Sequence, residues 1–258
     1  MRRRPIELAE MTWQEARDAA ADGAVALLPA GATEAHGPHL PLATDVVISR
    51  EAAVRACRAL VEAGTPALVL PPLAYAVTEF AASFAGTISI SMDTAVLMAR
   101  DVILGATRAG FAGVVVCNAH LEPGNLEALR AGVEQARERG AKAVFPDVTR
   151  KPHALRLGDE FRSGACHAGR YETSLVMAAD PFLVLGEKVD GLPPNPSSLS
   201  TAIREGKKSF VEAGGPEAYF GWPADATAAE GEGLYGELAD IFASVARELI
   251  AGVSSRPR

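Results

Sequence analysis

Short apolar runs alternate with stretches of helical periodicity along the first half of the chain. Runs at residues 24–29, 67–71, 113–117 and 141–145 have the length and apolar character of buried strands. Apolar residues at helical spacing predict helices over residues 46–61, 94–108 and 124–138. This alternation implies right-handed crossovers, and it predicts a layered α/β domain with a mostly parallel sheet covered on both faces.

The second half of the chain is less regular. Residues 190–215 are rich in Pro, Ser and Gly and predict an irregular surface excursion, either a lid or an oligomer contact. A long closing helix that lies on the sheet or on a partner subunit is predicted by an apolar stripe of Leu234, Leu238, Ile241, Phe242, Val245 and Leu249. The sequence has no internal repeat and no clear domain boundary, so we expect a single domain over residues 1–258.

Composition narrows the possible partners. The 258 residues are 48% hydrophobic, enough for a large core, and the net charge of -7 with scattered Lys and Arg argues against nucleic acid. The basic start Met1–Arg4 lacks the apolar segment of a signal peptide, and no run suits a membrane span. Three widely spaced cysteines, Cys57, Cys117 and Cys166, suit reduced thiols. These features predict a cytoplasmic protein with a small-molecule substrate.

Two polar clusters directly follow predicted strands. The first holds Glu34 and His36, with Asp45 shortly after, and the second holds His120 and Glu122. In open α/β sheets the carboxyl ends of strands form ligand crevices, and residues two apart on extended backbone face one side. Mixed imidazole and carboxylate ligands suit zinc, manganese or iron. Satisfied histidines in surface loops are the plainer alternative, which two clusters at equivalent strand ends make less favourable.

Charge predicts the number of ions. Glu34, Asp45 and Glu122 bring three negative charges, whereas His36 and His120 are neutral ligands. One divalent ion would leave the site negative, and two would leave it about one unit positive, which suits a bridging hydroxide. We therefore expect two divalent ions. His39 fits a structural role, or a donor behind the ligands, better than ligation.

A third cluster covers residues 166–174. His167 precedes a flexible Ala-Gly turn, where its imidazole could act as general acid or hold a developing oxyanion. Glu172 and Ser174 have two equally favoured interpretations. They could cap a helix and supply an acidic residue in its first turn, or they could take part in catalysis. His153 lies in a polar stretch and is expected to be solvated.

Residues 29–45 (PAGATEAHGPHLPLATD) closely resemble the signature of the creatininase (creatinine amidohydrolase) family. The resemblance continues through residues 84–87, 118–120, 167–174 and 226–233, and so covers nearly the whole chain. It implies a three-layer α/β/α fold, a homohexamer and a binuclear zinc or manganese centre. The matching residues for one ion are Glu34, Asp45 and His120, and those for the other are His36, Asp45 and Glu122, with Asp45 as the bridge.

Some positions depart from the family pattern. Many relatives have Asn-Gly-His-Gly-Gly-Asn where this chain has residues 118–125 (NAHLEPGN), so either Glu122 or Glu172 could supply the last ligand. Cys166 stands where creatininase has a glutamate, which argues against creatinine itself as the substrate.

The leading functional hypothesis is a metal-dependent amidohydrolase. A metal-activated hydroxide would cleave a non-peptide C–N bond, in a cyclic amide or formamide of a small polar substrate, with His167, Glu122 and Glu172 as candidate catalytic residues. A hydrolase or isomerase that opens a cyclic ketone or sugar-derived ring on the same centre is the main rival. A non-catalytic metal-binding assembly protein is the weaker one, because five or six ligands leave positions open on two ions.

Overall fold

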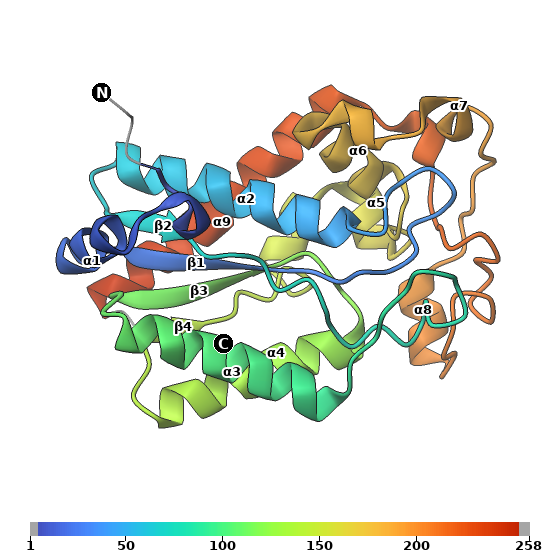
Figure 1. Cartoon of the computed structure of the whole chain (residues 1–258). Coiled ribbons are helices and arrows are strands. Elements are labelled where there is room, and N and C mark those ends of the chain that lie inside the picture. Colours follow the sequence, from blue (N-terminus) through green and yellow to red (C-terminus); the bar gives the residue numbers. More distant parts are fainter. Residues whose placement is uncertain (1–4, 253–258) are drawn as a thin grey trace.

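A parallel sheet forms the middle layer of the computed structural model, which describes residues 5–252 (Figure 1). Its strands are β1 (Val25–Ala30), β2 (Ala67–Val69), β3 (Gly113–Asn118) and β4 (Ala143–Val144), in the order β2-β1-β3-β4. Val25 pairs with Ala67 on one side and with Gly113 on the other. Each residue of β1 and β3 is buried, as expected for strands covered on both faces.

Helices cover the two faces as separate layers (Figure 1). One face carries α2 (Thr44–Glu62), α6 (Arg170–Ala179) and α9 (Ala228–Ala251), which pack on one another around Tyr235 and Phe242. The other face carries α3 (Met92–Arg108) and α4 (Pro123–Glu138), with α1 (Trp13–Ala21) contributing Ala19 to the same core. The predicted α/β/α architecture is confirmed. The predicted closing helix is α9, which packs on α2, α6 and the sheet strand β3.

Shorter elements surround the carboxyl end of the sheet. Five of them are η2 (His153–Arg156), α5 (Gly158–Ser163), η3 (Pro181–Leu183), α7 (Gly186–Val189) and η4 (Pro223–Asp225), and η1 (Leu8–Glu10) lies near the start. Residues 190–215 are irregular except for α8 (Leu199–Arg204), which Ser198 caps by accepting a hydrogen bond from the Thr201 N–H. Six residues offer too little periodicity for α8 to be predicted. Phe210 of this segment is buried against Phe80, Phe84 and Phe220.

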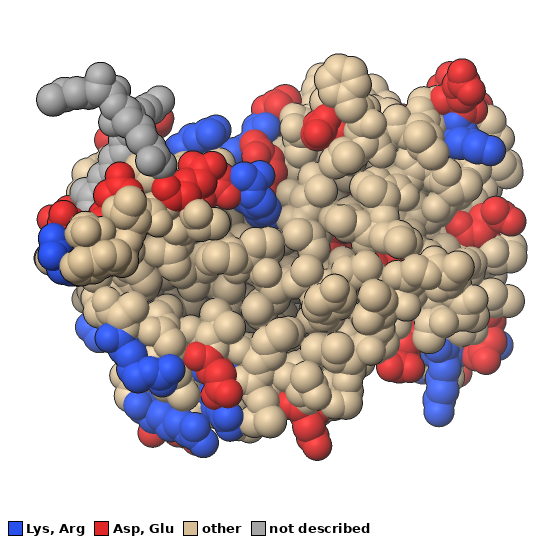
Figure 2. All heavy atoms as spheres, viewed as in Figure 1, with Lys and Arg blue, Asp and Glu red and all other residues tan. Residues whose placement is uncertain are grey.

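The charged surface is mixed on the face shown in Figure 2, where acidic and basic groups are interspersed rather than gathered in a basic stripe. Within residues 5–252 we find no helix that combines the length and apolar character of a membrane span. Residues 1–4 at the basic start of the chain, and residues 253–258 at the far end of the expected single domain, lie outside the described residues.

Candidate metal centre

The predicted ligands converge at the carboxyl ends of β1 and β3. Glu34 and His36 follow β1, His120 follows β3, and Asp45 lies in the first turn of α2, where the helix dipole favours a carboxylate. Gly31 permits this close approach. A Cβ atom at Gly31 would lie 2.7 Å from the Asp45 carbonyl carbon and 2.7 Å from the Val46 nitrogen.

His120 forms one group with Glu34 and Asp45. Its Nδ1 lies 3.1 Å from Glu34 Oε1 and 3.1 Å from Asp45 Oδ2. Its Nε2 lies 2.9 Å from the Val77 carbonyl oxygen, to which it donates. This bond turns Nδ1 toward the two carboxylates, so that on loss of its proton His120 has the tautomer that a metal ligand needs.

His36 forms a second group with Asp45 and Glu172. Its Nε2 lies 3.3 Å from Asp45 Oδ1, 3.6 Å from Glu172 Oε2 and 3.7 Å from Glu34 Oε1. Its Nδ1 donates to the Glu34 carbonyl oxygen over 3.1 Å. Asp45 therefore turns one oxygen toward each group, as a carboxylate that bridges two ions would.

Two buried atoms of these groups, His36 Nε2 and Asp45 Oδ2, form no hydrogen bond of good geometry, although His120 Nδ1 lies 3.1 Å from Asp45 Oδ2. Buried polar atoms are rarely left unpaired, and an exception calls for an explanation such as an ion. The ligand atoms of His36, Asp45 and Glu172 lie within 4.8 Å of one another, and the same limit holds for Glu34, His120 and Glu122. The nitrogen and oxygen donors fit two divalent ions of zinc, manganese or iron type.

The two candidate glutamates occupy different places. Glu172 Oε2 accepts the Ala168 N–H over 2.6 Å and faces His36. Glu122 is grouped with Glu34 and His120, and its oxygens accept the backbone N–H groups of Glu79 over 2.9 Å and Phe80 over 3.2 Å. The geometry thus favours Glu172 over Glu122 in the group of His36, and Glu122 belongs beside His120.

Protons supply positive charge in the ion-free centre. Burial opposes protonation of His36, but the carboxylates of Asp45, Glu172 and Glu34 raise its pKa to about 10. Likewise, burial opposes a proton on His120, but Glu34 and Asp45 raise its pKa well above the usual value. Burial raises the pKa of Glu172 to about 8 despite the nearby His36. Cations that replace these protons would balance the same carboxylates.

His167 lies between the second group and an aromatic wall. Its ring centroid is 4.4 Å from that of His36 and 4.2 Å from that of Phe210. Nε2 donates to the Ala35 carbonyl oxygen over 3.0 Å, and Nδ1 lies 3.8 Å from Glu34 Oε1. Burial, and then the charge on His36, lower the pKa of His167 to about 4. At neutral pH the imidazole is therefore neutral, with an unprotonated Nδ1 on the side of Glu34.

Three other predicted residues lie outside the two groups. His39 is buried and its Nε2 contacts Thr173 Oγ1 over 2.9 Å, which ties the His36 loop to α6. Ser174 Oγ accepts the Thr227 N–H over 3.0 Å, next to the start of α9, so its position suits capping rather than chemistry. His153 lies in η2 and is half-buried rather than solvated as expected.

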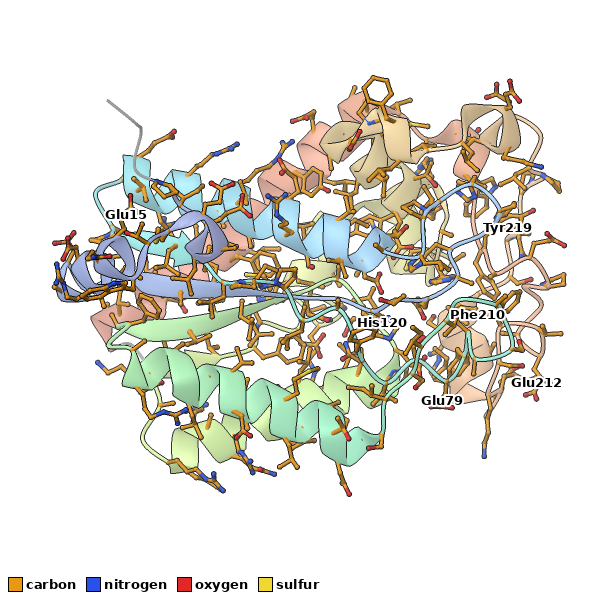
Figure 3. All side chains as sticks on the ribbon, in the orientation of Figure 1. Glu15, Glu79, His120, Phe210, Glu212 and Tyr219 are labelled. Carbon is orange, nitrogen blue, oxygen red and sulfur yellow. The ribbon has the colours of Figure 1, made fainter. Side chains whose placement is uncertain are left out.

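The centre opens into a cavity of about 660 Å³. Glu34, Asp45, His120 and Glu172 lie at its buried end, and Phe80, Phe161 and Phe210 contribute to its walls. Figure 3 shows His120 at the carboxyl end of the strands, with Phe210 and Glu79 beyond it. A cavity that places unpartnered ligand atoms beside a neutral imidazole is suited to metal-assisted proton transfer.

Glu160 is a buried residue whose role the sequence patterns do not predict. Its Oε1 accepts the Arg170 and Trp222 N–H groups, each over 2.8 Å, and its Oε2 accepts the Tyr171 N–H over 2.6 Å. It thereby holds the first turn of α6, which carries Glu172. The glycines at 169 and 221 are the available signal, since a Cβ at either would lie 2.7 or 2.2 Å from Glu160 Oε1.

Replacing Glu160 by alanine is expected to lower the free energy of unfolding by about 2–4 kcal/mol, because three buried or part-buried backbone N–H groups lose their acceptor. Glu160→Gln keeps one acceptor oxygen, so its loss should be smaller. Urea unfolding measures both, with the exposed Glu138→Ala at the end of α4 as the control. A Glu160→Ala variant as stable as the control would show that these bonds contribute little.

Comparison with known proteins places this architecture in one family. The sequence model of that family, described as creatinine amidohydrolase, matches residues 9–246. The "Mycofactocin precursor peptide peptidase" of Mycobacterium ulcerans is 33% identical over 219 residues, covering 83% of this chain and 81% of that protein. The "Creatinine amidohydrolase" of Pseudomonas putida is 30% identical over 211 residues, covering 73% of this chain and 77% of that protein.

A solved structure of a mutant creatininase complexed with creatine has a TM-score of 0.75 and 25% identity, covering 95% of this chain and 98% of that one. The chain therefore belongs to the creatinine amidohydrolase, or creatininase, family.

Proposed function

We propose that this protein hydrolyses an amide C–N bond with the help of two divalent ions, zinc or manganese, with iron as a further option. The observation that carries the proposal is the pair of buried ligand groups that share Asp45. Glu34, Asp45 and His120 would hold one ion, with Glu122 beside it. His36, Asp45 and Glu172 would hold the other.

When bound, such ions supply Lewis acidity and lower the pKa of water at the site. The chain's own residues would then handle protons and position. His167 Nδ1 accepts a proton from the attacking water and returns it to the leaving nitrogen, while Nε2 stays on the Ala35 carbonyl. Glu122, held by two backbone N–H groups, offers a second carboxylate beside His120 for the substrate or the proton.

The cavity supports substrates larger than a small ring. A drug-sized ligand occupies a pocket of roughly 300–1,000 Å³, and the cavity here is about 660 Å³ with aromatic walls. Cyclic amides and formamides remain the leading class. A peptide amide is the second candidate, because the Mycobacterium ulcerans relative is named a precursor peptide peptidase.

Metal loading tests the centre. Elemental analysis should find close to two ions per chain after incubation with zinc or manganese. Binding at pH 7 should release about three protons, because His36, with a pKa of about 10, Glu172, with a pKa of about 8, and His120 hold them in the ion-free protein. Ion affinity should consequently rise with pH. Calorimetry in buffers of different ionisation enthalpy measures the protons, and stable loading of a single ion would disprove the binuclear centre.

Hydrolysis is tested with the loaded protein on cyclic amides, N-formyl amino acids and short peptides. Asp45→Asn serves as the inactive control, because it removes the charge that both groups share. Turnover of cyclic ketones alone would favour the ring-opening rival instead.

We also propose a cytoplasmic homo-oligomer, a hexamer by family resemblance. The unpaired cysteines, Cys57, Cys117 and Cys166, support a reducing compartment.

A further inference from the structure

Three basic side chains from separate segments line the cavity away from the metal centre. Lys151 follows β4 in the chain, Arg162 lies in α5, and Arg204 is the last residue of α8. All three are exposed, whereas the carboxylates of Asp45 and Glu172 are buried. The cavity therefore has cations at its mouth and acids at its floor.

These cations have no acidic partners among residues 5–252. Arg204 donates to the Ser200 carbonyl oxygen over 3.3 Å and to Thr201 Oγ1 over 2.9 Å, both neutral acceptors of its own helix. Nearby arginines behave differently, since Arg130 pairs with Asp147 and Arg156 pairs with Glu237. The three mouth cations are thus free to bind an anion from solution.

The charge balance of the loaded cavity also favours an anion. Four lining carboxylates, Glu34, Asp45, Glu122 and Glu172, carry about -4, which two divalent ions would cancel. What remains is the charge of Lys151, Arg162 and Arg204, about +3, at the mouth of a cavity whose apolar walls focus its field. The chain as a whole carries a net charge of -7, so this positive field is local.

Apolar side chains occupy the region near the three cations. Leu155 lies between Lys151 and Arg162 in sequence, and Leu199 and Ile203 of α8 line the cavity together with Arg204. Phe210 stacks on His167 at the inner end. A matching ligand has an amide at the centre, an apolar middle and an anionic far end.

We propose that Lys151, Arg162 and Arg204 bind an anionic group, a carboxylate or a phosphate, at the end of the substrate remote from the bond that is cleaved. The location of that bond rests on the proposed function. The carboxylate and phosphate sources share the same chemistry, because both accept charge-assisted hydrogen bonds from Lys and Arg.

The test compares three compounds on the zinc-loaded protein. These are N-formyl-leucyl-phenylalanine with a free carboxylate, the same compound as its carboxamide, and an N-formyl-leucyl-phosphoserine amide. Hydrolysis gives kcat/KM, and calorimetry gives Kd for any compound that is not cleaved. The wild type should favour either anionic compound over the carboxamide by about tenfold or more, and the better anion identifies the source.

Two charge-matched variants test whether the three cations cause the preference for an anionic compound. In Lys151→Gln/Arg162→Gln/Arg204→Gln the preference should fall to about twofold or less, with the ion content unchanged. Arg58→Gln/Lys142→Gln/Arg247→Gln removes the same charge from exposed residues outside the cavity and should keep the preference.

Two results would overturn the proposal: a wild type that treats acid and amide alike, or control and mouth variants that lose the preference equally. Lack of hydrolysis of every compound would count against the proposed function, while the Kd ratios would still decide the role of the cations.

Discussion

Asp45→Ala is expected to lose both ions, whereas His36→Ala loses one. The reason is geometric, because Asp45 turns Oδ1 toward His36 and Oδ2 toward His120, while His36 Nε2 faces only the second group and the edge of Glu34. Elemental analysis after dialysis should give near zero ions per chain for Asp45→Ala and about one for His36→Ala.

Asp93→Ala provides the matched control. Asp93 lies in the first turn of α3 as Asp45 lies in the first turn of α2, but it is exposed. It should retain about two ions. Loss of one ion in both Asp45→Ala and His36→Ala would mean that Asp45 serves a single ion.

Changing His167 should lower turnover by roughly 10²- to 10⁴-fold while both ions stay bound, which is the usual range for proton transfer by a side chain. His167→Ala removes the imidazole. His167→Gln can still donate to the Ala35 carbonyl, now 3.0 Å from Nε2, yet it lacks a basic nitrogen. If proton transfer is the role of His167, both variants should be impaired alike on a substrate found in the screen.

Three other results would assign a different role. Recovery of turnover in His167→Gln would indicate that the hydrogen bond to the Ala35 carbonyl matters and the base does not. Loss of ions with turnover would make His167 a ligand, in line with its grouping with Glu34 and His36. Unchanged turnover in the His167 variants would show that His167 takes no part in the reaction. Unchanged turnover is the result expected for the comparison variant His153→Ala in η2.

The layers of the fold could be predicted from periodicity because each strand and long helix buries a continuous apolar set. The predicted strand over residues 113–117 corresponds to β3 (Gly113–Asn118), and the predicted helix over 94–108 to α3 (Met92–Arg108). The short helix α8 was not predicted, since Leu199–Arg204 spans fewer than two turns.

The convergence of the ligands could be anticipated, but the place of each glutamate could not. Glu34, His36, Asp45 and His120 come together because parallel strands end at one edge of the sheet. The choice between Glu122 and Glu172 depends on where α6 packs. Glu160 fixes the start of α6 by accepting hydrogen bonds from the Tyr171 and Trp222 N–H groups. These partners are distant from Glu160 in sequence, so the residues adjacent to it carry no motif that predicts the bonds.

Gly31 makes the centre intolerant of an inherited change that leaves every ligand intact. A single added methyl group would lie 2.7 Å from the backbone that carries Asp45, closer than packed atoms allow, so α2 or the end of β1 must move. Substitution by alanine or serine would move the Asp45 carboxylate away from the other ligands by tenths of an ångström. Displacements of that size weaken metal binding, because a metal site requires its ligands at closely defined positions. In a survey of natural or random variants, position 31 should therefore be as restricted as a ligand, although it offers no atom to an ion.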